Sequence, residues 1–157
     1  MTIIYDNVLN EQQLNLVEQE INFLMPLLEV SHIDGSAKKK KKGTGYLLPE
    51  ENAKSLVPNI HALGSTYNDG HKMSVLLNVY DDNGYYKRHT DDTEKTLIFF
   101  LKRNEDIFTG GELVVEDDVI EYENNIAVEF KGEQEHEVLP VSIQSGKRLS
   151  LTYFYYK

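Results

Sequence analysis

The hydrophobic pattern divides the chain into a helical first third and a strand-rich remainder. We predict a helix from about Glu11 to Leu24, capped by Asn10 with Gln13 as its capping-box partner and ended near Pro26. A second, short helix is expected from Pro49 toward Ser55, because proline is tolerated in a first helical turn. The first prediction rests on apolar residues that recur at helical spacing, namely Leu14, Val17, Ile21, Leu24 and Leu28.

From His71 onward the apolar residues alternate with polar ones, which is typical of strands. In Lys72–Tyr80, one face is wholly apolar and the other, which carries Asn78 and Tyr80, is mixed. Short strands separated by turns indicate a β-sandwich or barrel. The other predicted strands are Tyr85–Asp91, Thr96–Leu101, Glu112–Val115, Ile120–Tyr122, Ile126–Phe130, Glu135–Val141 and Arg148–Tyr155.

The order of these elements predicts a mainly β, α+β fold, in which N-terminal helices pack on the outside of a jelly roll. The 157 residues favour one domain, with helical support over about 1–65 and a jelly-roll core over about 71–156. Phe108–Gly111 is expected to be a turn between two of the strands.

Charge and composition narrow the class of protein. The net charge of −10 argues against nucleic acid as the main partner. No apolar run is long enough for a membrane span, and Met1–Asn10 does not resemble a signal peptide. The sequence has no cysteine, which fits a reducing compartment, so we expect a cytoplasmic protein.

Five consecutive lysines, Lys38–Lys42, lie in a segment expected to be a loop, from Ser31 to Thr44. We favour a solvated, mobile loop, because charge runs usually face water. A flap that faces a substrate is the alternative, because loops beside a rigid scaffold often carry binding groups.

His89-Thr90-Asp91 is the first candidate for chemistry. In a strand, residues two apart share a face, so this imidazole and carboxylate can share a metal ion. Such a tripeptide also occurs by chance, and a second histidine is needed to complete a two-His-one-carboxylate site, which suits non-heme Fe(II). Of the four other histidines, His136 is the one well inside the β-rich half and distant from His89 in sequence.

The last predicted strand places Arg148, Ser150 and Thr152 on one face. A buried arginine is unfavourable unless an anion meets it. A dicarboxylate cosubstrate would match the guanidinium fork, and an acidic side chain of the protein is the alternative partner.

Four segments in this order resemble the Fe(II)- and 2-oxoglutarate-dependent dioxygenases, specifically the prolyl 4-hydroxylase-like branch. They cover about Lys72 to Tyr155 and are Tyr80–Asp91, Phe108–Leu113, His136–Val141 and Gly146–Thr152. The resemblance implies a double-stranded β-helix, which is a form of jelly roll.

The resemblance also implies a role for particular residues. Fe(II) would be bound by His89, Asp91 and His136, and 2-oxoglutarate by Arg148 with help from Tyr80 and Thr152. The substrate side would include Tyr86, Arg88 and Tyr46. One departure concerns Phe100, which stands where oxygen-sensing relatives have a tyrosine that also contacts the cosubstrate, so anchoring must rest more on Arg148.

The implied activity is hydroxylation of a C–H bond, with a prolyl residue in a peptide or protein as the expected substrate. Dioxygen and 2-oxoglutarate would be consumed, succinate and CO2 released, and ascorbate would support turnover. Alternatives are a free amino acid or other small molecule as the substrate, a non-catalytic metal-binding or interaction module, and a closed zinc site. Alkylation-repair relatives carry a second arginine where this chain has Phe154, which disfavours a nucleic-acid substrate.

Overall fold

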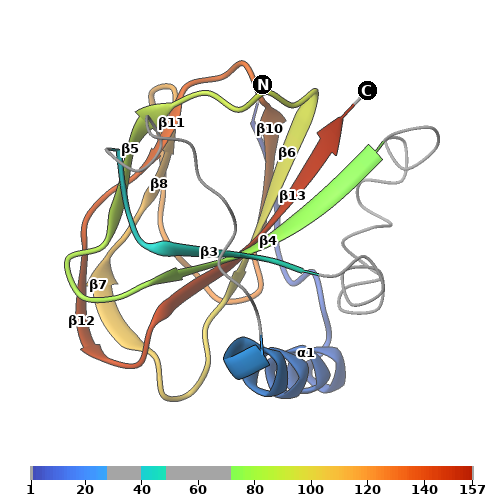
Figure 1. The fold of residues 1–157 in the computed structure, drawn as a ribbon, viewed down its shortest axis with the longest axis vertical. Coiled ribbons are helices and arrows are strands. Elements are labelled where there is room, and N and C mark those ends of the chain that lie inside the picture. Colours follow the sequence, from blue (N-terminus) through green and yellow to red (C-terminus); the bar gives the residue numbers. More distant parts are fainter. Residues whose placement is uncertain (1, 28–39, 49–71, 157) are drawn as a thin grey trace.

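The computed structural model describes residues 2–27, 40–48 and 72–156. Within them the chain is mostly β, with antiparallel strands in two facing sheets and α1 (Glu11–Leu24) outside them (Figure 1). This is the predicted jelly-roll class with helical support. The helix expected over Pro49–Ser55 and most of the loop over Ser31–Thr44 lie outside the described residues. No helix in the described part of the chain is long and apolar enough to cross a membrane.

The larger sheet pairs strands that lie far apart in sequence. Its central strand, β13 (Arg148–Tyr156), is hydrogen-bonded to β4 on one side and to β6 on the other. The order across the sheet is β1 (Ile3–Tyr5), β10 (Ala127–Lys131), β6 (Lys95–Leu101), β13, β4 (Lys72–Tyr80) and β3 (Thr44–Leu47).

The smaller sheet faces the larger one and holds the remaining functional segments. Its order is β2 (Lys41–Lys42), β5 (Tyr85–His89), β11 (His136–Val138), β8 (Leu113–Val115) and β9 (Asp118–Ile120). A separate pair joins β7 (Ile107–Gly110) to β12 (Val141–Ser145).

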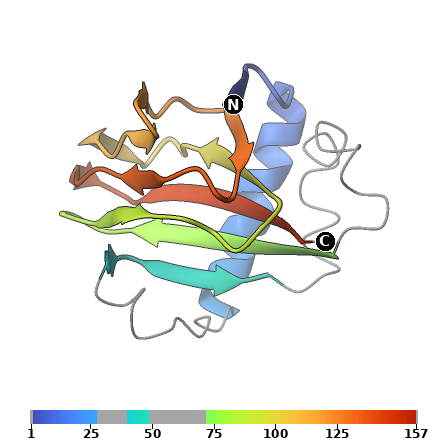
Figure 2. The same cartoon turned by 90° about the horizontal axis from the view of Figure 1, so that it is seen from above.

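Helix α1 begins and ends as predicted, and is followed by a 3-10 turn, η1 (Met25–Leu27). The Asn10 side chain accepts a hydrogen bond from the Gln13 backbone N–H, and the Gln13 side chain accepts one from the Asn10 backbone N–H. Such a cap stabilises a helix by about 1 kcal/mol. Figure 2 shows α1 crossing the strands on one face of the larger sheet.

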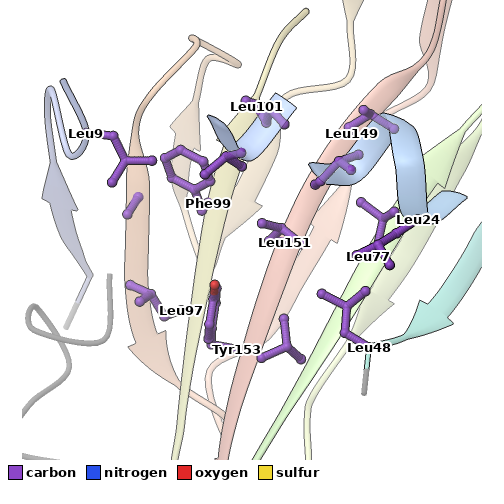
Figure 3. Close-up of a cluster of buried hydrophobic side chains, with 14 of the residues drawn as sticks. Leu9, Leu24, Leu48, Leu77, Leu97, Phe99, Leu101, Leu149, Leu151 and Tyr153 are labelled. Atoms are coloured by element: carbon purple, nitrogen blue, oxygen red, sulfur yellow. The ribbon is translucent and has the colours of Figure 1, made fainter. Parts of the chain in front are cut away.

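The core between α1 and the larger sheet holds the side chains from one face of each central strand. Val17 and Ile21 of the helix are buried in the same cluster as three residues of β13. These three, Leu149, Leu151 and Tyr153, are labelled in Figure 3. A second cluster, between the sheets, includes Phe100, Leu113 and Phe130. Because side chains alternate along a strand, those on the other face of β13, which include Arg148 and Thr152, point between the sheets.

Several predicted boundaries are wrong. The strand β5 ends at His89, so Asp91 lies in the loop that follows. The predicted turn at Phe108–Gly111 is mostly strand β7, and only Gly110 and Gly111 have positive φ. The strand expected over Glu135–Val141 is interrupted before β12 by Leu139 and Pro140, since proline offers no N–H to a ladder.

The strand predicted over Ile120–Tyr122 also differs from the structure. The observed strand, β9, ends at Ile120. Tyr122 lies beyond it, with its hydroxyl at hydrogen-bond distance from the carbonyl oxygens of Leu101 (2.8 Å) and Leu149 (2.6 Å). The Tyr122 ring therefore packs against the hydrophobic cluster between the sheets, and Tyr122 is not part of a strand.

Candidate active site

Three side chains with metal-binding atoms meet between the two sheets. His89 ends β5, Asp91 follows it in the loop, and His136 begins β11, directly opposite His89 in the ladder. Nε2 of His136 lies 3.2 Å from Oδ2 of Asp91, and Nε2 of His89 lies 3.7 Å from Oδ1 of Asp91. All three ligand atoms lie within 4.8 Å of one another, and no other such group occurs among the described residues.

The backbone fixes the orientation of both imidazole rings. Nδ1 of His89 lies 2.7 Å from the carbonyl oxygen of Lys87, and Nδ1 of His136 lies 2.9 Å from that of Gln134. Each Nδ1–H therefore donates to the carbonyl two residues earlier. This tautomer leaves the Nε2 lone pair directed at the shared centre, which is the arrangement that metal-binding histidines usually show.

The protonation states favour metal binding. Burial, and then the nearby His136, lower the pKa of His89 to about 4, so the ring is neutral at pH 7. Burial opposes ionisation of Asp91, but the adjacent His136 and the hydrogen bond from the Thr96 hydroxyl outweigh it and keep the pKa of Asp91 below its ordinary value. A neutral His89 ring and an ionised Asp91 carboxylate are thus available as ligands.

The distances fit a single octahedral ion. Two neighbouring ligand atoms, each about 2.1 Å from such an ion, lie about 3.0 Å apart. The measured separations of 3.2 and 3.7 Å are close to this value. Two histidines and one carboxylate on one side of an ion leave its other positions open, whereas a structural zinc site needs a fourth protein ligand. Fe(II) is therefore the metal that these residues fit best.

A bulge in β5 decides which residues face this centre. Val138 pairs with Tyr86 although His136 pairs with His89, so β5 carries one extra residue over this stretch. Tyr86 and His89, three residues apart, consequently both line the cavity, and their rings stack with centroids 3.6 Å apart. Tyr86 thus forms part of the cavity wall beside His89, and its substrate-side role stays a prediction.

Arg88 is not part of the cavity lining, and its predicted place on the substrate side stays a prediction. Its Nε donates to Glu135 at 3.0 Å, and its Nη2 donates to the carbonyl oxygen of Glu116 at 2.9 Å. The side chain is exposed, because the bulge turns Lys87 and Arg88 outward together.

Beside the three ligands the sheets enclose a cavity of about 810 Å³, and Arg148 lies in its wall. The Arg148 side chain is 1% exposed, and its Nε donates to the carbonyl oxygen of Gly111 at 2.8 Å. No carboxylate lies within 4.0 Å of its guanidinium among the described residues, so the acidic partner considered as an alternative is absent there. Burial lowers the pKa of Arg148, as expected for a cation without a counter-ion.

Aromatic rings surround this guanidinium. Its central carbon lies 5.2 Å from the ring centre of Tyr80, 5.5 Å from Phe100 and 4.8 Å from Tyr122. Phe100 contributes no hydroxyl here, and the Tyr122 hydroxyl is engaged by backbone carbonyls. The cavity therefore holds a desolvated cation that is fixed by rings and one backbone bond, and that can meet an anion in a fork.

The two predicted helpers lie in the same cavity. Tyr80 is 2% exposed and pairs with Arg148 across the ladder, and burial raises the pKa of its hydroxyl. The Thr152 hydroxyl accepts a hydrogen bond from Nδ2 of Asn78 at 2.9 Å. Asn78 was not among the predicted site residues, although strand alternation already placed it on the mixed face with Tyr80.

Tyr46 lies on the opposite side of the sheet from the cavity. It packs against the cluster beneath α1, whereas its neighbour Leu47 lines the cavity. The position in strand β3 that faces the cavity is thus Leu47, and nothing in the structure supports the substrate-side role predicted for Tyr46. Lys41, predicted to be in a solvated loop, is instead in strand β2 and lines the cavity.

Comparison with known proteins agrees with this geometry. A sequence profile described as the 2OG-Fe(II) oxygenase superfamily matches residues 75–156, more than half of the chain. The chain belongs to this superfamily, and it is therefore a 2-oxoglutarate-dependent oxygenase. No match was found among curated protein sequences.

Solved structures of prolyl hydroxylases share the fold. A Pseudomonas putida prolyl-4-hydroxylase superposes with a TM-score of 0.75 at 19% identity, covering 99% of this chain and 92% of that one. A prolyl hydroxylase from Trichoplax adhaerens, in complex with a hypoxia inducible factor peptide fragment, gives 0.71 at 16%, covering 99% and 83%. A viral collagen prolyl hydroxylase from Paramecium Bursaria Chlorella virus-1, in a 2OG complex, gives 0.69 at 16%, covering 98% and 94%.

Proposed function

We propose that the protein is an Fe(II)- and 2-oxoglutarate-dependent dioxygenase that hydroxylates prolyl residues in a peptide or protein. The observation that carries the proposal is the presence of His89, Asp91 and His136 in the same cavity as the buried Arg148, which has no carboxylate partner among the described residues. The fold shared with three prolyl hydroxylases supports the choice of a prolyl substrate.

The protein's own residues would bind and orient the reactants. His89, Asp91 and His136 would hold Fe(II), with each Nε2 held in place by the backbone bond at Nδ1. Bound iron, with 2-oxoglutarate and O2, would supply the oxidation that hydroxylates a C–H bond and releases succinate and CO2.

Nε of Arg148 already donates to the Gly111 carbonyl oxygen. Its two terminal nitrogens would therefore donate to the distal carboxylate of 2-oxoglutarate, one hydrogen bond from each. Thr152 and Tyr80 line the adjacent wall. Apolar side chains of the cavity, among them Leu47 and Ile98, would exclude water around the reacting C–H bond.

The substrate would enter beside Tyr86. Its ring stacks on His89 and forms part of the cavity wall, so an apolar pyrrolidine ring placed against it would lie close to the metal ligands. We include ascorbate in the proposal only as a reductant that would keep the iron in the Fe(II) state.

The test is incubation of the protein with Fe(II), 2-oxoglutarate and a set of proline-containing peptides. We expect succinate to form and a peptide to gain the mass of one oxygen, with the added oxygen on proline in fragment spectra. Asp91→Ala should abolish both products, whereas Asp117→Ala, which removes an exposed carboxylate in a turn, should retain them. Succinate formation together with an oxidised free amino acid, and no oxidised peptide, would refute the peptidyl substrate.

A further inference from the structure

Lys41 is a second cation in the cavity that no role above requires. Its Nζ donates to Oδ1 of Asn78 at 2.5 Å and lies 5.2 Å from the ring centre of Tyr86 and 5.8 Å from that of Tyr80. The side chain is therefore held by one hydrogen bond and two aromatic rings. Its neighbour in the same strand, Lys42, is exposed.

Strand pairing explains why one lysine of the run points inward. In β2, Lys41 pairs with Tyr86 and Lys42 pairs with Tyr85. Since successive side chains leave a strand on opposite faces, Lys41 joins Tyr86 in the cavity and Lys42 faces away. The two lysines are chemically identical and one residue apart, so each is the natural control for the other.

The described residues place no carboxylate in direct contact with Lys41. Among the described residues, no carboxylate lies within 4.0 Å of its Nζ, and only one of its three N–H donors has a partner, Asn78. Burial lowers the pKa of Lys41 to about 8, although Asp91 acts in the opposite direction. A partly buried ammonium that faces a cavity, and that has one hydrogen-bond partner among the described residues, is expected to bind an anion there.

A hydrogen bond to Asn78 fixes the position of the Lys41 ammonium in the cavity. Nδ2 of Asn78 donates to the Thr152 hydroxyl, which directs the Asn78 carbonyl oxygen toward Lys41. Along β4, Asn78 lies two residues from Tyr80, which is the ladder partner of Arg148. Two residues of strand span roughly 7 Å, which is comparable with the length of a five-carbon dicarboxylate.

We propose that Lys41 is a second carboxylate-binding residue of this cavity, beside the Tyr86 ring that stacks on His89, a role that rests on the proposed function. The carboxylate would come either from the 1-position of 2-oxoglutarate or from the substrate. In the first case Lys41 and Arg148 hold the two ends of one molecule. In the second, the preferred substrate carries a carboxylate near its reacting carbon, as a C-terminal proline does.

The first arm of the test measures 2-oxoglutarate binding to the Fe(II)-loaded protein by anaerobic calorimetry. If the ligand is the cosubstrate, Lys41→Met raises its dissociation constant by roughly 10-fold or more, because a charge-assisted hydrogen bond is lost. Lys41→Arg retains most of the affinity, and Lys42→Met matches the wild type. Thermal melting of each metal-free variant shows whether it is folded.

The second arm adds peptides that end in proline, with either a free carboxylate or an amide, to the protein carrying Fe(II) and 2-oxoglutarate. If the ligand is the substrate, the wild type prefers the free acid and Lys41→Met loses that preference, while 2-oxoglutarate affinity stays unchanged. Unchanged 2-oxoglutarate affinity together with no Lys41-dependent preference for the free acid overturns the role of Lys41 alone. A wild-type protein that binds no 2-oxoglutarate overturns the proposed function, and the role of Lys41 with it.

Discussion

Replacing Arg148 by methionine should separate cosubstrate binding from stability. Methionine fills a similar volume but removes the charge from a side chain that is 1% exposed and has no described carboxylate partner. Losing a charge-assisted pair with the distal carboxylate should cost about 2–3 kcal/mol, which is roughly a 30- to 150-fold weaker affinity for 2-oxoglutarate. The affinity for Fe(II) should not change, because Arg148 does not contribute a ligand atom.

The same substitution should not destabilise the protein in the absence of cosubstrate. A buried cation without a described counter-ion opposes folding, and removing it should offset the loss of its hydrogen bond to the Gly111 carbonyl, so the melting temperature is expected to change little. The assays are anaerobic calorimetry with Fe(II) and 2-oxoglutarate, and thermal melting without them. Lys147→Met is the control, because Lys147 is the adjacent residue and pairs with Asp81 at the surface. Unchanged 2-oxoglutarate affinity in Arg148→Met would show that the anion site lies elsewhere.

Three further changes test the site from other directions. His136→Ala should abolish Fe(II) binding in calorimetry, and retained one-to-one binding would mean that this ring is not a ligand. Gly111→Ala should lower both the melting temperature and the 2-oxoglutarate affinity. Gly111 has φ +71°, and a Cβ there would lie 2.9 Å from Cδ of Arg148. An unaltered melting temperature and affinity would contradict this packing. The pKa of His89 is lowered from 6.5 to about 4, so between these pH values the unfolded chain binds more protons than the folded one. The free energy of unfolding of the metal-free protein should therefore fall by at most about 3 kcal/mol as the pH is lowered through this window. Denaturant titrations of the wild type and His89→Gln check this, since a wild-type slope that persists in the variant must come from other groups.

Features set by local periodicity were predictable from the sequence. Helix α1 follows from the spacing of Val17, Ile21 and Leu24 and from the Asn10 cap, and the structure has it over the predicted residues. The division of β13 into an apolar face and a face with Arg148 also follows, because a long, regular central strand has no bulge to change its alternation. In both cases each residue's environment is decided by its near neighbours in sequence.

Features set by pairing between distant strands were not predictable. The bulge that brings Tyr86 beside His89 and turns Arg88 outward exists only relative to β11, which lies about fifty residues later. The side of the sheet that Tyr46 occupies depends on its register with Leu77 of β4. A shift of one residue reverses every side chain, so these assignments need the partner strand.

The lysine run shows how composition conceals a paired strand. Charged residues in sequence are typical of a solvated loop, and Lys42 does face outward. The position of Lys41 depends on pairing of β2 with Tyr86, and on Asn78, which is distant in sequence. No periodic signal exists in a strand of two residues.

Asp91 was predicted correctly as a neighbour of His89, but for an incomplete reason. Strand alternation does not apply to it, because β5 ends one residue after Arg88. Its carboxylate is positioned instead by the Thr96 hydroxyl and by the backbone bond from its own N–H to the carbonyl oxygen of Gly132. Neither partner is adjacent in sequence, so the geometry of this ligand comes from the folded loop.

The central claim is that three protein ligands hold one metal while Arg148 anchors 2-oxoglutarate in the same cavity. Crystals grown anaerobically with Mn(II) as a stand-in for Fe(II) and with 2-oxoglutarate test it most directly, through the anomalous signal of the metal. We predict one metal bound by His89, Asp91 and His136, with the distal carboxylate of 2-oxoglutarate on the Arg148 guanidinium. A metal bound by a fourth protein ligand, or a cosubstrate whose distal carboxylate lies away from Arg148, would contradict the account.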